Sequence, residues 1–217
     1  MPPKPLPRPD SDLVEDLCLV LYGSLRTEGP DAAPDPVPLA CALFDAGHRG
    51  DAVREVLECT PAALSGAELA ALAARLLSEC AFDPGFTHAP ERLEVLRGAL
   101  RVAARDLPSA GHHGAPRLML LEDAFPPAAG VVLADGRRLE GGLLASTGDD
   151  PTGAVAAVAE HLQEGLMTLT RRVWPVCDRH GLGVHPVVRN DAAVWWCAAA
   201  QGPPLARVGE LTRSRRQ

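Results

Sequence analysis

Four residues near the C-terminal end of the chain belong to the types that bind zinc. Cys177 and His180 stand at Cys-x2-His spacing, and His185 and Cys197 follow them. Thiolates and imidazoles at such spacing are the usual ligands of structural Zn²⁺ sites. The four residues therefore predict a zinc site, provided that the chain folds back between them.

The fold that would gather these ligands is a tight turn followed by a β-hairpin. Residues 185–189 and 193–197 are expected to form two short strands around a loop. A three-residue loop would place His185 opposite Cys197 on one face of the hairpin. A two-residue loop would shift the register by one position and put these side chains on opposite faces. The sequence leaves both registers open, so His185 is a conditional fourth ligand.

A structural metal is preferred here to a catalytic one. Neither the H-E-x-x-H motif nor the H-x-E with P-C-x-x-C pattern of zinc deaminases occurs in the sequence, so no general-base carboxylate stands at a recognisable spacing. Phosphate loops, dinucleotide fingerprints and nucleophile elbows are also missing. Enzymatic function is therefore disfavoured, and the alternative to a zinc site is that Cys177 and Cys197 are simply thiols of the core.

The C-terminal segment, which carries the pattern WPxCxxH followed by WWC, resembles the C-terminal modules of uncharacterised actinobacterial proteins. The quoted residues are 174–180, 182–185, 194–197 and 208–211. The resemblance implies a zinc-ribbon-like module but no known activity. It also implies a His near position 201, where this chain has Gln201.

The first half of the chain has the apolar spacing of helices. Ser65 and Glu68 form a capping box ahead of the clearest helix, and Leu69, Leu72 and Leu76 lie on its apolar face. Similar patterns predict further helices at 11–24, 38–46, 51–58 and 91–106. Together they predict a helical domain over residues 11–107.

A Pro- and Gly-containing linker is predicted at residues 108–116, followed by a second domain over 117–217. Strand patterns there surround an Asp135-Gly136 turn. Asp150 then caps a helix over 151–170 that should pack on the small antiparallel sheet. The expected fold class is α+β: an N-terminal helical bundle, then a small antiparallel sheet with one packed helix, and a C-terminal zinc-ribbon-like β-hairpin.

Composition agrees with a helix-rich protein. Apolar residues make up 47% of the chain and aromatic residues only 4%, which favours closely packed helices over a β-sandwich. Residues 1–10 are rich in proline and are expected to be a disordered arm. No signal-peptide pattern or long apolar span is present, so a cytoplasmic location with reduced cysteines and no membrane partner is expected.

The charge distribution bears on partners. The net charge is −7, yet residues 171–217 carry eight arginines against three acidic residues. Trp195 and Trp196 should point to opposite faces of a strand, one packing on the helix at 151–170 and the other free for contact. With Arg189 they are the predicted partner-binding residues. The leading hypothesis is a non-enzymatic protein-binding or adaptor protein with structural zinc. The alternatives are nucleic-acid binding through the basic end and a metal-dependent enzyme with an open zinc site.

Overall fold

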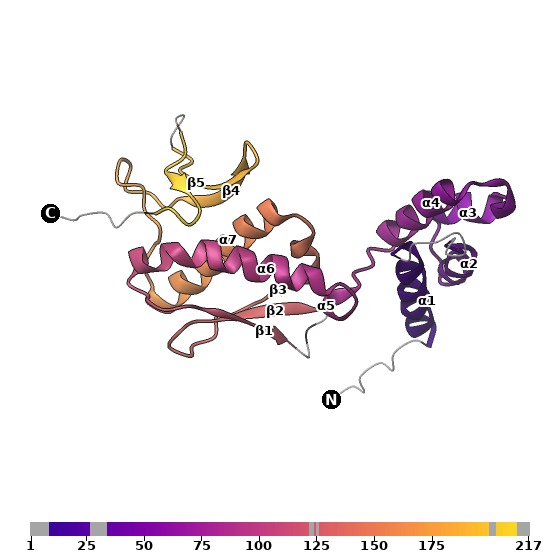
Figure 1. Ribbon diagram of the computed structural model, residues 1–217, viewed down its shortest axis with the longest axis horizontal. Helices are drawn as coiled ribbons and strands as arrows, with labels where there is room; N and C mark the ends of the chain where they lie inside the picture. The colour runs from indigo at the N-terminus through magenta and orange to yellow at the C-terminus, as the bar shows by residue number, and fades with distance from the viewer. Residues whose placement is uncertain (1–8, 27–33, 122–123, 125, 200–202, 212–217) are drawn as a thin grey trace. The chain divides into compact units, whose positions relative to one another are not determined.

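The computed structural model describes residues 9–26, 34–121, 124, 126–199 and 203–211 (Figure 1). The chain divides into two compact units, Met1–Pro84 and Gly85–Gln217. The N-terminal helices precede the strands along the chain, and both sheets are antiparallel. The predicted α+β class is thus confirmed. Most of the predicted arm at 1–10 lies outside the described residues, but Pro9 and Asp10 already belong to the first helix.

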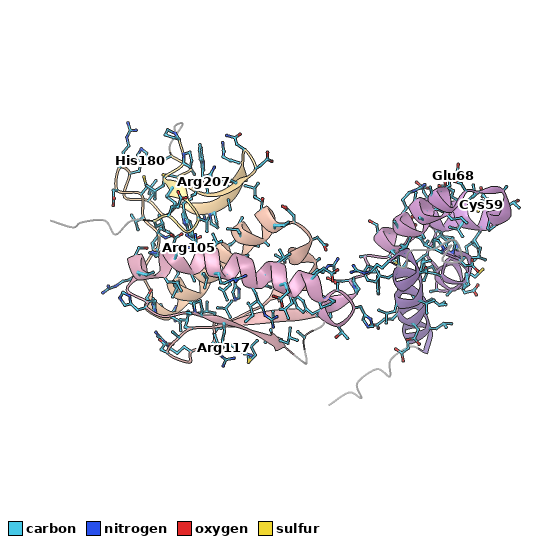
Figure 2. All side chains as sticks on the ribbon, in the orientation of Figure 1. Cys59, Glu68, Arg105, Arg117, His180 and Arg207 are labelled. Carbon is cyan, nitrogen blue, oxygen red and sulfur yellow. The ribbon has the colours of Figure 1, made fainter. Side chains whose placement is uncertain are left out.

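The first unit is a helical bundle with its own core. Its α-helices are α1 (Pro9–Leu25), α2 (Val37–Asp45), α3 (Asp51–Glu58) and α4 (Gly66–Glu79), with a short 3-10 helix η1 (Pro61–Ala63) before α4. The predicted capping box is present at α4 (Glu68 is labelled in Figure 2): the Ser65 hydroxyl accepts from Glu68 N, and Ser65 N donates to the Glu68 carboxylate at 2.8 Å. Apolar faces of all four helices meet in one cluster.

The second unit contains the other elements. Its helices are α5 (Gly85–His88), α6 (Pro90–Ala103), η2 (Ala104–Ala110), η3 (Ala145–Asp149) and α7 (Pro151–Thr170). Its strands are β1 (Arg117–Leu121), β2 (Ala128–Val132), β3 (Leu143–Leu144), β4 (His185–Arg189), β5 (Ala192–Trp196) and β6 (Ala206–Arg207).

The boundary between the units differs from the expected linker at 108–116. It falls at Pro84 and Gly85, so α6 belongs to the second unit and not to the N-terminal bundle. Leu96, Leu100 and Leu107 are buried in the core of the second unit, together with α7 and both sheets. The Pro- and Gly-containing stretch begins inside η2 and is therefore part of the second unit, because Leu107 holds that segment in the core.

The first sheet has the order β1-β2-β3. The predicted Asp135-Gly136 turn follows β2: Gly136 has a positive φ of 87°, and Leu133 N donates to Arg137 O at 2.8 Å. Asp150 caps α7 as predicted, since its carboxylate accepts from the backbone N–H groups of Thr152 and Gly153.

The second sheet has the order β4-β5-β6. Its hairpin has a two-residue loop, because Arg189 pairs with Ala192. The two loop residues, Asn190 and Asp191, both adopt positive φ angles, of 49° and 57°. This backbone is that of the primed two-residue turns, and Asn and Asp tolerate it better than most residues. Of the two open registers, the structure has the one that separates His185 from Cys197.

Within the second unit, α6 and α7 form a layer between the two sheets (Figure 1). One core runs through the whole unit, from Val131 in β2 past Leu162 in α7 to Trp195 in β5. The second sheet therefore rests on α7 by a buried face and turns its other face outward. None of the helices in the described ranges has the length and apolar character needed to cross a membrane.

Candidate metal centre

A tight turn brings Cys177 and His180 together. Cys177 O accepts from His180 N at 3.2 Å and from Gly181 N at 2.8 Å, and Cys177 N donates to Leu182 O at 2.8 Å. Gly181 has a φ of 67°, a conformation that glycine adopts without strain. The turn thus carries the His180 imidazole back over the Cys177 sulfur, which is the geometry that the Cys-x2-His spacing predicts.

The electrostatics of the turn favour a thiolate at Cys177. Burial raises the pKa of Cys177, but the backbone N–H groups of His180 and Arg179 and the neighbouring Cys197 thiol outweigh it. The pKa of Cys177 therefore lies below its usual value. Backbone N–H groups that point at a cysteine sulfur stabilise negative charge there, and a thiolate is the form that binds metal.

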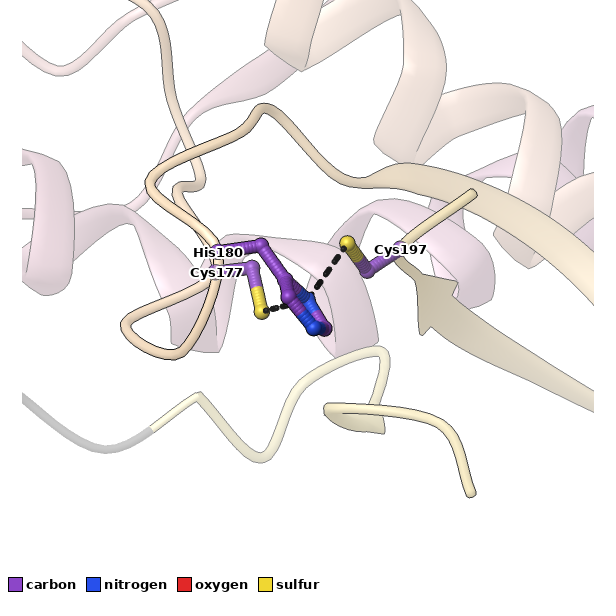
Figure 3. A group of neighbouring side chains, drawn as sticks. All are labelled: Cys177, His180 and Cys197. Atoms are coloured by element: carbon purple, nitrogen blue, oxygen red, sulfur yellow. Dashed lines mark hydrogen bonds between the residues drawn. The ribbon is translucent and has the colours of Figure 1, made fainter. Parts of the chain in front are cut away.

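The end of β5 supplies the second sulfur. Side chains alternate along the strand, so Ala193, Trp195 and Cys197 share the buried face of the sheet. Cys197 Sγ lies 3.4 Å from His180 Nδ1, and Cys177 Sγ lies at the same distance from this nitrogen. The imidazole stands between the two sulfurs (Figure 3). Residues that are 20 positions apart in the chain thus converge on one point.

The three side chains fit a tetrahedral metal. All three ligand atoms lie within 4.8 Å of one another. With Zn–S bonds of about 2.3 Å and a Zn–N bond of about 2.0 Å, a tetrahedral zinc separates its sulfur and nitrogen ligands by about 3.5 Å. The observed separations of 3.4 Å match that edge. Two thiols and one imidazole are also the ligands that zinc prefers over magnesium or calcium.

His185 does not belong to this group. It pairs with Trp196 in the hairpin, one position before Cys197, and its exposed side chain therefore lies on the outer face. The cause is the two-residue loop, which sets a register that sends His185 and Cys197 to opposite faces. Within the described ranges the metal-binding group consists of Cys177, His180 and Cys197. Gln201, where the resemblance implies a His, lies outside those ranges.

Gln163 holds the turn against α7. This buried side chain donates from Nε2 to Trp174 O at 2.9 Å and to Val184 O at 2.6 Å. The two carbonyls flank the turn that carries Cys177 and His180. No motif in the sequence marks Gln163, although a glutamine between Leu162 and Leu166 on a helix with a buried apolar stripe is an available signal.

Asp106 anchors the hairpin from the other side. Its fully buried carboxylate accepts from the Trp195 indole at 2.8 Å and from the backbone N–H groups of Gly209 and Leu211, each at 2.7 Å. Burial raises the pKa of Asp106, and these three hydrogen bonds oppose the rise. Gly209 fits because its φ is 91° and a Cβ there would come within 2.8 Å of Val102 O.

The same contacts correct one predicted role. Trp195 is 1% exposed, donates to Asp106 and lies edge to face against Trp174, with ring centroids 5.5 Å apart. It is therefore a core residue and has no surface for a partner. As predicted, the two adjacent tryptophans point to opposite faces, because side chains alternate along β5.

Trp196 and Arg189 lie on the outer face of the hairpin, as their predicted role requires. The Arg189 guanidinium stacks over the Trp196 ring at 3.6 Å from its centroid. Beside them an open hollow of about 490 Å³ extends to Arg207, which pairs with Val194 across the sheet. Figure 2 shows the Arg207 side chain in this region. The hollow is lined by Arg189, Asn190, Ala192, Val194, Trp196, Pro203, Pro204 and Arg207.

We define these eight lining residues as the outer hollow. Two are arginines, and no carboxylate is among the described residues that line it. Arg189 and Arg207 are both exposed, and no ion pair within the described ranges engages either of them. The outer hollow thus combines an apolar floor with positive charge.

Comparisons with known proteins do not assign this centre. The resemblance of the C-terminal segment to actinobacterial modules therefore stays a prediction. No family model, no curated protein and no solved structure matches the chain.

Proposed function

We propose that this protein is a non-enzymatic binding or adaptor protein. In this proposal a structural zinc ion, held by Cys177, His180 and Cys197, stabilises the second sheet. The outer hollow then binds an acidic segment of a protein partner. The observation that supports this proposal is the position of the three ligands. They converge directly behind the hairpin whose outer face bears the outer hollow.

A structural role suits the place of the centre in the chain. Cys177 and His180 lie on an irregular segment between α7 and β4, whereas Cys197 follows β5. A metal bound to all three would join this segment to the hairpin. Metal sites of this kind contribute directly to folding free energy when the module is too small for a large core of its own.

An acidic partner suits the chemistry of the outer hollow. Arginine is well suited to bind carboxylates, because its planar guanidinium donates two parallel hydrogen bonds. Arg189 is already positioned by its stacking on Trp196. Less side-chain freedom therefore remains to be lost when a carboxylate binds. The apolar floor formed by Val194, Pro203 and Pro204 would receive aliphatic parts of the same segment.

The stacking also favours a protein partner over a nucleic acid. Proteins that bind single strands use exposed aromatic rings on which bases stack. In this structure the Arg189 guanidinium covers a face of the Trp196 ring, and Trp195 is buried. The hairpin therefore offers guanidinium groups more readily than bare rings.

Binding of a defined acidic peptide tests the proposal. We expect the zinc-loaded full chain to bind a fluorescein-labelled oligoglutamate peptide, with an affinity that falls as salt is added. Arg207→Gln and Arg189→Gln should each weaken binding by about threefold to tenfold. The matched control is Arg97→Gln, an exposed arginine of α6 that pairs with Glu94, and it should bind normally.

Other results of these binding experiments would contradict the proposal. Tighter binding of a single-stranded oligothymidylate than of the peptide, lost in the same two variants, would support the nucleic-acid alternative. Binding of neither probe would overturn the proposal for the outer hollow. If EDTA removes the metal and leaves peptide binding unchanged, the structural role of the metal is refuted.

The metal-dependent enzyme remains the second alternative, because three ligands are also what a catalytic zinc uses. Cobalt-substituted protein separates the two roles. The three protein ligands leave a tetrahedral metal one further position, but Cys177 and Cys197 are buried. If the role is structural, azide should not reach that position and the visible spectrum should stay unchanged. A shifted spectrum would reveal an exchangeable fourth position and support an open site.

A further inference from the structure

Two cysteines of the first unit lie in contact, away from the candidate metal centre. Cys18 lies in α1 and Cys80 is the C-cap of α4, and their sulfur atoms are 3.7 Å apart. The two residues are 62 positions apart in the chain. Cys18 is 2% exposed, whereas Cys80 is only partly buried. A third ligand that could complete a metal site does not accompany them among the described residues.

The two thiols have different chemical characters. The hydrogen bond with Cys18 and the backbone N–H of Phe82 lower the pKa of Cys80 to about 7, although its burial acts in the opposite direction. The same hydrogen bond and burial raise the pKa of Cys18. At neutral pH, Cys80 is therefore the group with substantial thiolate, and Cys18 stays protonated beside it.

This arrangement is that of a nucleophilic cysteine with a resolving partner. A partly exposed thiolate reacts with peroxides, and a second thiol nearby then forms a disulfide. A disulfide bond is about 2.0 Å long, so the sulfurs must approach by about 1.7 Å. Cys80 lies where α4 ends and is followed by Ala81 at a φ of 52°. Cys80 N still donates to Leu76 O at 3.2 Å and its Sγ lies 3.3 Å from Leu77 O, so the approach of the two sulfurs requires only a local shift at this helix end.

We propose that Cys18 and Cys80 are a redox modification site that forms a reversible disulfide in the presence of a hydroperoxide. The Cys80 thiolate attacks the peroxide, forms a sulfenic acid and releases the alcohol, or water from hydrogen peroxide itself. The Cys18 sulfur then attacks the Cys80 sulfur, and the hydroxyl of the sulfenic acid leaves as water with the Cys18 proton. The two thiols are oxidised and the O–O bond is reduced.

The disulfide would link the first and last helices of the N-terminal bundle. It would close a loop of 62 residue positions, and closing a long loop restricts the unfolded chain. The oxidised protein should therefore unfold at a higher temperature than the reduced protein. A thiol reductant should reverse the shift.

The test uses the full chain, reduced and then treated with stoichiometric hydrogen peroxide. We expect the protein to lose the mass of two hydrogen atoms, and a nonreducing peptide map to recover Cys18 linked to Cys80. Cys18→Ser should instead accumulate a sulfenic acid at Cys80 that dimedone traps. The matched control, Cys41→Ser, changes an exposed cysteine of α2 and should form the disulfide as the original chain does.

The peptide map also identifies the contrary results. Recovery of Cys18 and Cys80 as alkylated thiols, with Cys177 linked to Cys197, would overturn the proposal because the oxidation would then lie at the metal ligands. Oxidation of Cys80 to the sulfinic acid without any link to Cys18 would overturn it as well. The map of the original chain gives this answer even if a serine variant fails to fold.

Discussion

Trp195 donates its indole N–H to the buried carboxylate of Asp106 at 2.8 Å, although the two residues are 89 positions apart. The hydrogen bond joins the end of the α6 and η2 segment to the central strand of the second sheet. It also fixes the strand face from which Cys197 extends toward His180. The position of one candidate metal ligand thus depends on a carboxylate that does not touch the metal centre.

Asp106→Asn should destabilise the second unit by about 2 kcal/mol. The carboxylate of Asp106 accepts three hydrogen bonds, and the amide NH₂ of asparagine would place a donor against at least one of those donors. Denaturant unfolding followed by tryptophan fluorescence measures this, since all three tryptophans lie in the second unit. Asp191→Asn, in the exposed hairpin loop, is the control and should be neutral. Equal stability of the two variants would contradict the anchoring role of Asp106.

Metal content should depend on three of the four cysteine and histidine residues named from the sequence. We expect one zinc per chain by elemental mass spectrometry, lost in Cys177→Ser and in Cys197→Ser. His185→Ala should retain the metal, because His185 lies on the outer face of the hairpin. Loss of zinc in His185→Ala would show that the hairpin register differs from the one described.

Chelation should destabilise the second unit selectively. EDTA should lower its unfolding midpoint, since a metal that binds only the folded state stabilises that state. The first unit contains none of the ligands and no tryptophan, so tryptophan fluorescence follows the second unit alone and should report the change. Identical unfolding curves with and without EDTA would mean that the site binds no stabilising metal.

Gln163→Leu should weaken both the fold and the metal site. It leaves two carbonyls, those of Trp174 and Val184, without their donor, at a cost of about 1–3 kcal/mol. Because those carbonyls flank the turn with Cys177 and His180, zinc affinity in a competition assay should fall. Glu164→Gln, exposed on the same helix, is the control. An unchanged zinc affinity would show that the turn keeps its shape without Gln163.

His161 should make the second unit sensitive to acid. Burial lowers the pKa of His161, with a smaller opposing effect from Glu164, and its buried Nε2 has no hydrogen-bond partner among the described residues. The unfolded chain therefore binds the proton more tightly. The free energy of unfolding therefore has its full value, as far as His161 is concerned, above the unfolded pKa of 6.5. It decreases as the pH falls below that value.

The measurement compares unfolding midpoints at about pH 7.5 and about pH 5.5. His161→Leu should lose less stability over this interval than the original chain. His88→Gln, which changes an exposed histidine at the end of α5 in the second unit, serves as the control and should keep the full pH dependence. Equal losses in the original chain and in His161→Leu would assign the acid sensitivity to other groups.

Local signals predicted the helices and part of the site. The Ser65 capping box and the Asp150 cap correctly marked the starts of α4 and α7, because capping depends on residues three positions apart. The Cys-x2-His spacing predicted the turn for a similar reason. Such patterns act within a few residues and are readable without knowledge of the tertiary fold.

Features that depend on distant residues were not predictable in the same way. The Pro- and Gly-containing stretch at 108–116 predicts a domain boundary, whereas the packing of Leu96 and Leu107 assigns α6 to the second unit. The buried partners of Asp106 are contributed by residues about a hundred positions later. The hairpin register was more nearly predictable from the sequence. Asn190 and Asp191 are both residue types that accept the positive φ angles of a two-residue turn.

The partners of Asp106 have a consequence for the order of events during synthesis. Gly209 and Leu211 follow Asp106 by 103 and 105 positions, and chain elongation adds about 5–20 residues each second. For several seconds at least, the carboxylate has none of these donors and must stay in water. The core around it can therefore close only after translation of the last strand, so a ribosome that stalls between β5 and β6 would hold a second unit that cannot finish folding.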